Sequence, residues 1–200
     1  MNQLRKDHIY SHFRYLWPAY VISALLIAGG LSLIFSIVHK IPEYKTLTIF
    51  ISGEVKDSKA LKDDLLNTYR DKELKSVGTI SADPSEGHYH TKLTVAGYSS
   101  ADVIILPMSK IESLDISYFA IDLKEELITN FYNGYTFYKQ DEVSYGVKLN
   151  KELVAPYMAL PNEDCYMFLN GNSQNLGEYS IYNPVKEHDM ALNVVKDWGM

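Results

Sequence analysis

Two groups of residues follow predicted apolar strands, at positions where they could bind a small polar solute. They are Ser52, Gly53 and Glu54 at the end of segment 46–52, and Met108, Ser109 and Lys110 after segment 101–106. In parallel α/β sheets, ligands bind beyond the carboxyl ends of the strands. Hydroxyl, carboxylate and amino groups at that edge therefore predict the lining of a polar-solute cleft. The alternative is that these are ordinary loop residues at strand ends.

The pair His88 and His90 has a spacing that would place both imidazoles on one face of a strand, where they could bind a metal ion. No cysteine or carboxylate completes a recognised metal-binding spacing, although Asp83 and Glu86 are near in sequence. Exposed loop histidines are the simpler interpretation. We predict neither a metal nor a cofactor.

The sequence lacks motifs that identify common hydrolases and nucleotide-binding enzymes. Ser109 has no G-x-S-x-G context, and there is no glycine-rich phosphate loop. The acidic pairs at 63–64 and 125–126 fit solvated helix faces. Cys165, the single cysteine, lies in a strand-like run and is interpreted as a small buried hydrophobic residue. We predict that the protein is not an enzyme, with a hydrolase of unrecognised site as the weaker alternative.

A run of 22 residues without a charged side chain, 17–38, precedes all of these positions. An α-helix needs about 20 apolar residues to cross the bilayer core, so this run predicts a transmembrane helix. Arg5, Lys6 and Arg14 precede the run, and such basic flanks stay in the cytoplasm. We predict a single-pass signal anchor in the cell membrane, with a cytoplasmic N-terminus and an extracytoplasmic domain. A cleaved signal peptide and a buried helix of a soluble protein are the alternatives.

The predicted organisation is a cytoplasmic tail at 1–16, the transmembrane helix at 17–38, a linker at 39–45 and an α/β domain at 46–200. Without the three basic residues and one acidic residue of the tail, the chain has 16 basic and 24 acidic residues, a formal charge of −8. Binding to nucleic acid needs a basic surface, and so does flat adhesion to anionic lipid. The charge therefore argues against both partners.

Strand-like and helix-like patterns alternate along the first half of the domain. The predicted strands are 46–52, 76–81, 101–106 and 166–170, with two further pieces within 137–149. The predicted helices are 59–71 (with Ser58 as N-cap), 88–96 (with a strand as the alternative), 108–114, 124–132 and 187–200. Such alternation predicts βαβ units, with helices on both faces of a parallel sheet.

Four segments resemble, in their order along the chain, the extracellular solute-binding proteins of bacterial ABC importers. They are TLTIFISGEVKDSKALKDDLL (46–66), ADVIILPMSKIESL (101–114), YGVKLNKE (145–152) and YMFLNGNSQNLG (166–177). The first resembles the opening strand and helix of these proteins, and the second their third strand. The third resembles the crossover strand and the fourth a late strand with its following turn. The resemblance implies a type 2 periplasmic-binding-protein-like fold over 46–200.

This resemblance implies a three-layer α/β domain that corresponds to one lobe of such a protein. A complete member has two lobes that close on the ligand, and it usually needs about twice this length. The second lobe is then missing or reduced to residues 123–138. The resemblance also implies further residues at the edge that carries Ser52 and Ser109, namely Tyr98, Ser99, Tyr145, Asn170 and Ser173.

Two functions follow from these interpretations. The first is a membrane-anchored, non-catalytic domain that binds a small polar solute or assists a transporter, with an ABC permease or another membrane protein as partner. The second is a degenerate lobe that docks on a membrane complex. Solute binding predicts a concave edge lined by Ser52, Ser109 and Tyr98, whereas docking predicts an exposed apolar patch.

Overall fold

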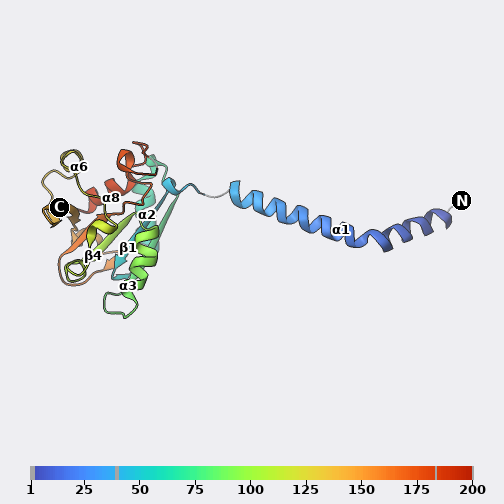
Figure 1. Ribbon diagram of the computed structural model, residues 1–200, viewed down its shortest axis with the longest axis horizontal. Coiled ribbons are helices and arrows are strands. Elements are labelled where there is room, and N and C mark those ends of the chain that lie inside the picture. Colours follow the sequence, from blue (N-terminus) through green and yellow to red (C-terminus); the bar gives the residue numbers. More distant parts are fainter. Residues whose placement is uncertain (1–2, 39–40, 183, 200) are drawn as a thin grey trace. The chain divides into compact units, whose positions relative to one another are not determined.

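The structure is a computed structural model that describes residues 3–38, 41–182 and 184–199. Residues 1–2 of the predicted tail, 39–40 of the predicted linker and 200 of the predicted final helix lie outside the described residues. The chain divides into two units, residues 1–40 and 41–200 (Figure 1).

The first unit consists of one helix, α1 (Gln3–Val38), which contains Pro18. Within the described residues, its segment Leu16–Phe35 is the one helix long and apolar enough to cross a membrane. The side chains of this segment are not buried in the protein; Leu26, for example, is 72% exposed. Proline removes a backbone hydrogen bond and bends a helix, and Figure 1 shows α1 bent in its N-terminal half. The predicted apolar helix is therefore present, and it begins already within the predicted tail.

The second unit is built on a six-stranded sheet with the order β3-β1-β4-β8-β6-β5. Its strands are β1 (Thr46–Ser52), β3 (Ser76–Ala82), β4 (Val103–Pro107), β5 (Phe137–Gln140), β6 (Val143–Lys148) and β8 (Cys165–Leu169). Strand β1 pairs in parallel with β3 and β4, whereas the pairs β4–β8, β8–β6 and β6–β5 are antiparallel. The α/β class is confirmed, but the parallel arrangement holds only for β3, β1 and β4.

Helices and short turns connect these strands. The helices of the second unit are α2 (Ser58–Thr68), α3 (Tyr89–Lys92), α4 (Tyr98–Ser100), α5 (Met108–Ile111), α6 (Glu125–Phe131), α7 (Lys151–Val154) and α8 (Met190–Trp198). Single turns are η1 (Glu43–Lys45), η2 (Arg70–Lys72), η4 (Ile116–Tyr118) and η5 (Gly177–Tyr179), and η3 (Leu93–Gly97) is a π-helical turn. Two short strands, β2 (Glu54–Val55) and β7 (Met158–Ala159), pair in antiparallel orientation.

Local sequence explains where two of the helices begin and end. The Asp57 side chain accepts a hydrogen bond of 2.8 Å from the backbone N–H of Ala60, so Asp57 rather than Ser58 is the N-cap of α2. Residues 89–100 are helical throughout, which confirms a helix rather than a strand after His88. The predicted end of this helix at residue 96 is wrong, because the π-helical turn at Leu93–Gly97 leads directly into α4.

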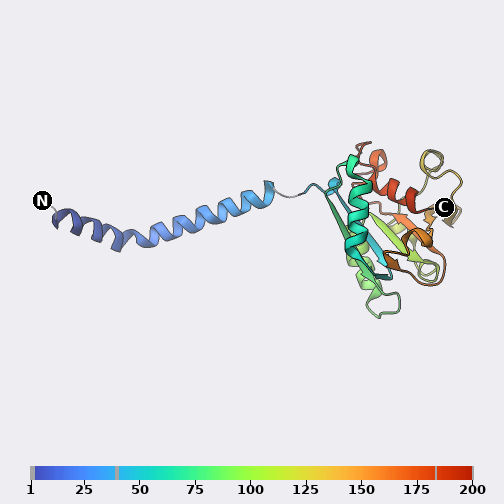
Figure 2. The same cartoon turned by 180° about the vertical axis from the view of Figure 1, so that it is seen from behind.

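The core forms two layers, one on each face of the sheet, because successive side chains of a strand point to opposite faces. Leu47, Ile49 and Ile51 of β1 pack in the cluster that contains Leu65 of α2 and the buried residues of α8. Phe50, between them, packs in the other cluster with Leu93 of η3. Figures 1 and 2 accordingly show α3 nearer the viewer in one view and α2 nearer in the opposite view.

Candidate functional site

Ser52 ends β1 at the edge where the sequence predicts a solute cleft, and its side chain is fully buried. Its Oγ lies 2.6 Å from the hydroxyl oxygen of Tyr89, and either group can donate this hydrogen bond. Burial raises the pKa of Tyr89 to about 12, so its hydroxyl stays protonated at neutral pH. The ammonium of Lys110 lies 5.2 Å from the centre of the Tyr89 ring. The Ser52 hydroxyl is therefore already engaged inside the protein.

The chain around β7 lies directly against the residues that follow Ser52. Glu54 of β2 pairs with Ala159 of β7. A Cβ atom on Gly53 would lie 2.3 Å from the Ala159 carbonyl oxygen and 3.3 Å from the Leu160 side chain. The backbone of β7 thus fills the space directly beyond β1, where solute binding predicts a concave edge.

Ser109 follows β4 at the same edge and is bound by Glu163. Its backbone N–H and its Oγ donate hydrogen bonds of 2.8 and 2.7 Å to the two carboxylate oxygens of Glu163. The N–H of its neighbour Met108 donates to the Asp164 carbonyl oxygen at 2.9 Å. The loop before β8 therefore accepts hydrogen bonds from the polar groups that were predicted to bind a ligand.

The structure separates the remaining predicted residues from this edge. Because β8 runs antiparallel to β4, Asn170, which follows β8, lies at the amino-terminal end of β4. Its buried Nδ2 group donates to the carbonyl oxygens of Gly97, Tyr98 and Ala101, the last at 2.7 Å. The expectation that Tyr98 and Asn170 line the same edge as Ser52 is wrong: Tyr98 precedes β4, and Asn170 follows a strand that runs antiparallel to β4.

Three further predicted residues also take structural positions away from Ser52. Ser173 is buried, and its Oγ donates a hydrogen bond of 2.5 Å to Asp102. The Ser99 hydroxyl donates to the Val95 carbonyl oxygen within its own helix. Tyr145 of β6 is half-buried against the cluster around Phe168. None of the three therefore extends the predicted cleft.

Asp102 is a buried carboxylate that the sequence analysis did not single out. Its Oδ2 accepts a hydrogen bond of 2.7 Å from the backbone N–H of Thr48. Its Oδ1 accepts from Ser173 Oγ and from Asn175 Nδ2, at 2.5 and 3.0 Å. Burial raises the pKa of Asp102, and the three hydrogen bonds oppose this rise. The residue joins β1, β4 and the loop after β8, and its position before an apolar strand is the signal that could have revealed it.

An open groove lies between two segments that follow different strands, 117–127 and 171–181, and we call it the Tyr118 groove. Its volume is about 620 Å³, and its lining residues are Ser117 to Asp122, Lys124, Leu127, Gly171, Asn172, Glu178, Tyr179 and Ile181. The Gly171 N–H donates to Phe119 O at 2.8 Å, and the Ile121 N–H donates to Leu169 O at 3.0 Å. The two walls, 117–124 and 171–181, are thus joined by backbone hydrogen bonds next to Asn170.

The Tyr118 groove combines buried apolar side chains with an exposed apolar rim. Phe119 and Leu127 are buried, whereas Tyr118 and Ile181 are 79% and 78% exposed. The Tyr98 ring stacks on Phe119 with 4.3 Å between ring centres, and it lies edge-on to Tyr118 at 6.2 Å. Tyr98 therefore packs against two residues that line the groove, although it does not itself line it.

Charged groups in the Tyr118 groove have no ionic partner among the residues that the structure describes. Asp122 and Lys124 on one wall and Glu178 on the other are exposed. Within the part of the chain that the structure describes, none of the three forms an ion pair or a side-chain hydrogen bond. The Tyr179 hydroxyl is buried and has no hydrogen-bond partner among the same residues. The groove thus offers both signs of charge and aromatic surface to a ligand.

Two smaller cavities have volumes of about 290 and 310 Å³. The first shares Glu178 and Tyr179 with the Tyr118 groove, and the second is lined by Tyr44 and His188 among others. None of the three cavities is lined by Ser52 or Ser109.

The histidine pair lies on the surface. His88 is exposed, and its Nε2 lies 2.8 Å from a carboxylate oxygen of Glu86. His90 is also exposed, and its ring contacts Tyr89 edge-on at 5.4 Å. Among the described residues there is no group of three histidine, cysteine, aspartate or glutamate side chains placed to hold a metal ion.

Comparison of the chain with protein-family models, with curated protein sequences and with solved structures gave no match. The resemblance to one lobe of a solute-binding protein therefore stays a prediction.

Proposed function

We propose that this chain is a single-pass membrane protein whose extracytoplasmic α/β domain binds a small polar ligand without catalysis. The apolar segment Leu16–Phe35 would lie in the bilayer, and the basic flank before it would keep the N-terminus in the cytoplasm. The resemblance to solute-binding proteins of ABC importers supports the class of function. The binding surface that we propose is the Tyr118 groove rather than the edge at Ser52.

The observation that carries this proposal is the content of the Tyr118 groove. Its volume of about 620 Å³ falls within the range of roughly 300–1,000 Å³ that is typical of small-molecule sites. Its aromatic and aliphatic rim offers contact area, and Asp122, Lys124 and Glu178 offer uncommitted polar groups. The edge at Ser52 offers less, because Ala159 and Glu163 occupy it.

The state of the nucleophilic side chains supports a role without catalysis. The hydroxyl groups of Ser52 and Ser109 are bound to Tyr89 and Glu163. Cys165 is buried, and burial raises the pKa of its thiol to about 11, so the reactive thiolate is scarce at neutral pH. Ser109 adjoins a carboxylate, but Glu163 binds its backbone N–H as well as its hydroxyl and so holds the serine in the loop.

The proposal is tested by thermal unfolding of the full-length protein in detergent, against sugars, amino acids, peptides and metal salts. A ligand present at about 100 times its dissociation constant should add about 2.7 kcal/mol to the free energy of unfolding. Ile181→Ala should remove the shift, whereas Val95→Ala, which also shortens an exposed aliphatic side chain, should retain it. A shift that persists in Ile181→Ala and in Tyr118→Ala would contradict binding in this groove.

The second candidate function is docking on a membrane complex, and the exposed side chains around the Tyr118 groove favour it. Tyr118, Ile181 and Tyr182 are 79%, 78% and 65% exposed, which is unusual for large side chains in one region. On this reading a membrane protein such as an ABC permease covers the rim. A photo-crosslinking amino acid at position 181 should then capture a membrane protein in cells, and the same group at position 95 should not.

A further inference from the structure

We propose that the ligand of the Tyr118 groove is a short peptide with free, charged ends. This inference rests on the proposed binding function and names its ligand class. It follows from the positions of three uncommitted charges and from the apolar surface between them.

Two of the charges suit a cation. Asp122 and Glu178 stand on opposite walls of the groove, and each carries a carboxylate without an ionic partner among the described residues. An ammonium group between them would gain charge-assisted hydrogen bonds. The exposed Tyr118 ring at the rim can add cation–π attraction. The α-amino group of a peptide meets these requirements.

The third charge, the ammonium of Lys124, suits an anionic group, and it lies two residues from Asp122. Asp122 and Lys124 are exposed, whereas Leu123 between them is buried and its N–H donates to the Ser144 carbonyl oxygen at 2.7 Å. Lys124 has extended backbone angles, and the alternating exposure fits an extended segment with the Asp122 and Lys124 side chains on the same side. Their Cα atoms are then about 7 Å apart. That separation matches the span between the two ends of an extended peptide of two to three residues, at about 3.5 Å per residue.

The remaining lining fits the middle of such a peptide. Ile121, Leu127 and Ile181 provide aliphatic surface for its side chains. The groove is larger than a single free amino acid requires, since about 620 Å³ lies well within the range of sites for larger ligands.

Other ligand classes match the lining less well. An inorganic anion would face the two carboxylates, and a hydrocarbon would desolvate three charges without compensation. A neutral sugar would form no ion pair with Lys124 or Glu178. A peptide with free ends pairs with all three.

Affinity selection tests the inference on the full-length protein in lipid nanodiscs. The probes are a randomised tripeptide mixture with free ends and the same mixture acetylated at the N-terminus and amidated at the C-terminus, with retained peptides quantified by mass spectrometry. We expect retention of the free-ended mixture only. Lys124→Gln and the double variant Asp122→Asn/Glu178→Gln should each reduce it at least about tenfold. Lys59→Gln, at an exposed position of α2, is the matched control and should retain wild-type binding.

Equal retention of the blocked mixture, or full retention by Lys124→Gln, would overturn the inference that charged ends are recognised. If no tripeptide is retained but a mixture of neutral oligosaccharides binds and Tyr118→Ala abolishes that binding, the peptide inference fails while the proposed binding function stands. The wild-type protein could also unfold cooperatively and yet retain neither the tripeptides nor the oligosaccharides. In that case both the peptide inference and the proposed binding function are wrong. Melting curves of each variant separate lost binding from lost folding.

Discussion

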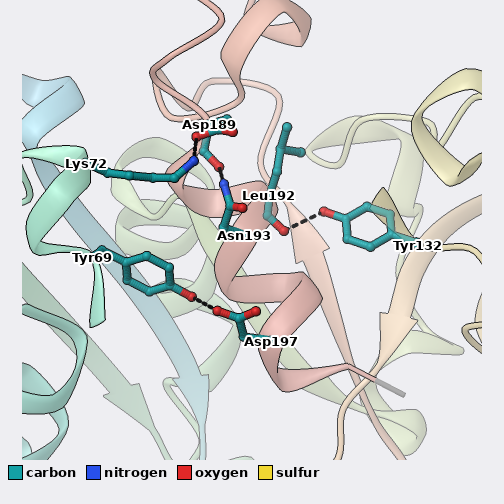
Figure 3. A network of polar contacts seen from close by, with 7 residues as sticks. All are labelled: Tyr69, Lys72, Tyr132, Asp189, Leu192, Asn193 and Asp197. Atoms are coloured by element: carbon teal, nitrogen blue, oxygen red, sulfur yellow. Dashed lines mark hydrogen bonds and ion pairs between the residues drawn. The ribbon is translucent and has the colours of Figure 1, made fainter. Parts of the chain in front are cut away.

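The phenol of Tyr69, just after α2, donates a hydrogen bond of 2.5 Å to Oδ2 of Asp197 in α8, so residues 128 positions apart in sequence are joined (Figure 3). Burial and this hydrogen bond raise the pKa of Tyr69. Figure 3 also shows the Lys72–Asp189 ion pair and the hydrogen bond of 3.0 Å from the Tyr132 hydroxyl to Leu192 O. Helix α8 is thereby tied to the rest of the domain by polar groups as well as by its apolar face.

Tyr69→Phe should lower the free energy of unfolding by about 1.5–2 kcal/mol, because hydrogen bonds to charged acceptors are the stronger class. Tyr135→Phe is the matched control, since its hydroxyl donates at an exposed position to the Lys196 carbonyl oxygen at 3.0 Å. It should cost about 0.5–1 kcal/mol. Urea unfolding of both variants measures the difference. Equal losses of unfolding free energy would show that the hydrogen bond to Asp197 stabilises the domain no more than the exposed one.

Asp102→Ala should be among the most destabilising single substitutions in the domain. It leaves the Thr48 N–H and the Asn175 amide buried without this acceptor, and each such loss costs about 1–3 kcal/mol. We expect a total loss of about 3–4 kcal/mol in chemical unfolding. The control Asp63→Ala, at an exposed position of α2, should stay within about 0.5 kcal/mol of wild type. A small effect at Asp102 would mean that the network relaxes around the missing carboxylate.

Gly53→Ala tests whether β7 closes the edge beyond Ser52. The added Cβ would meet the Ala159 carbonyl oxygen at 2.3 Å, a contact that forces the backbone to move. Crowding of this kind costs about 1–3 kcal/mol. Gly87→Ala meets no atom within 4 Å and should be nearly neutral. If thermal unfolding finds the two variants equally stable, β7 is not packed against Gly53 in solution.

Short-range patterns were sufficient to predict many of the elements but not how they assemble. The run TLTIFIS is apolar and β-branched, and β1 spans the same residues, Thr46–Ser52. Cys165 was expected to be buried and is. The direction of β8 depends on contacts between residues far apart in the chain. The local sequence around Asn170 therefore did not indicate that this residue would lie at the other edge of the sheet from Ser52.

The same limit applies to the candidate site. The Tyr118 groove brings together 117–127, which includes the start of the predicted helix 124–132, and 171–181, which includes the turn after the predicted strand 166–170, and no local pattern places these two segments side by side. Glu163, which binds Ser109, lies 54 residues away from it in the sequence. The pairing of Ala120 with Asn170, which depends on the completed sheet, brings the two walls of the groove together.

The reactivity of Cys165 should report unfolding. An unfolded cysteine has a pKa of about 8.5, whereas burial raises the pKa of Cys165 to about 11. The unfolded state therefore loses its thiol proton first, and stability decreases as the pH rises from about 8.5 towards 11. At pH 8 we expect iodoacetamide to modify Cys165 slowly in buffer and rapidly in urea. Fast modification of the folded protein would contradict the buried position of the thiol.

The proposed membrane orientation is testable with single cysteines, because the native Cys165 is shielded and should contribute little background labelling. Lys92→Cys, at an exposed position of α3, should react with a membrane-impermeant maleimide in intact cells. Gln3→Cys, in the segment before the apolar helix, should react only after the membrane is permeabilised. Arg5, Lys6 and Arg14 outweigh Asp7 in that segment, and basic flanks resist translocation. The opposite labelling pattern would place the domain in the cytoplasm, where an extracytoplasmic ligand could not reach the Tyr118 groove.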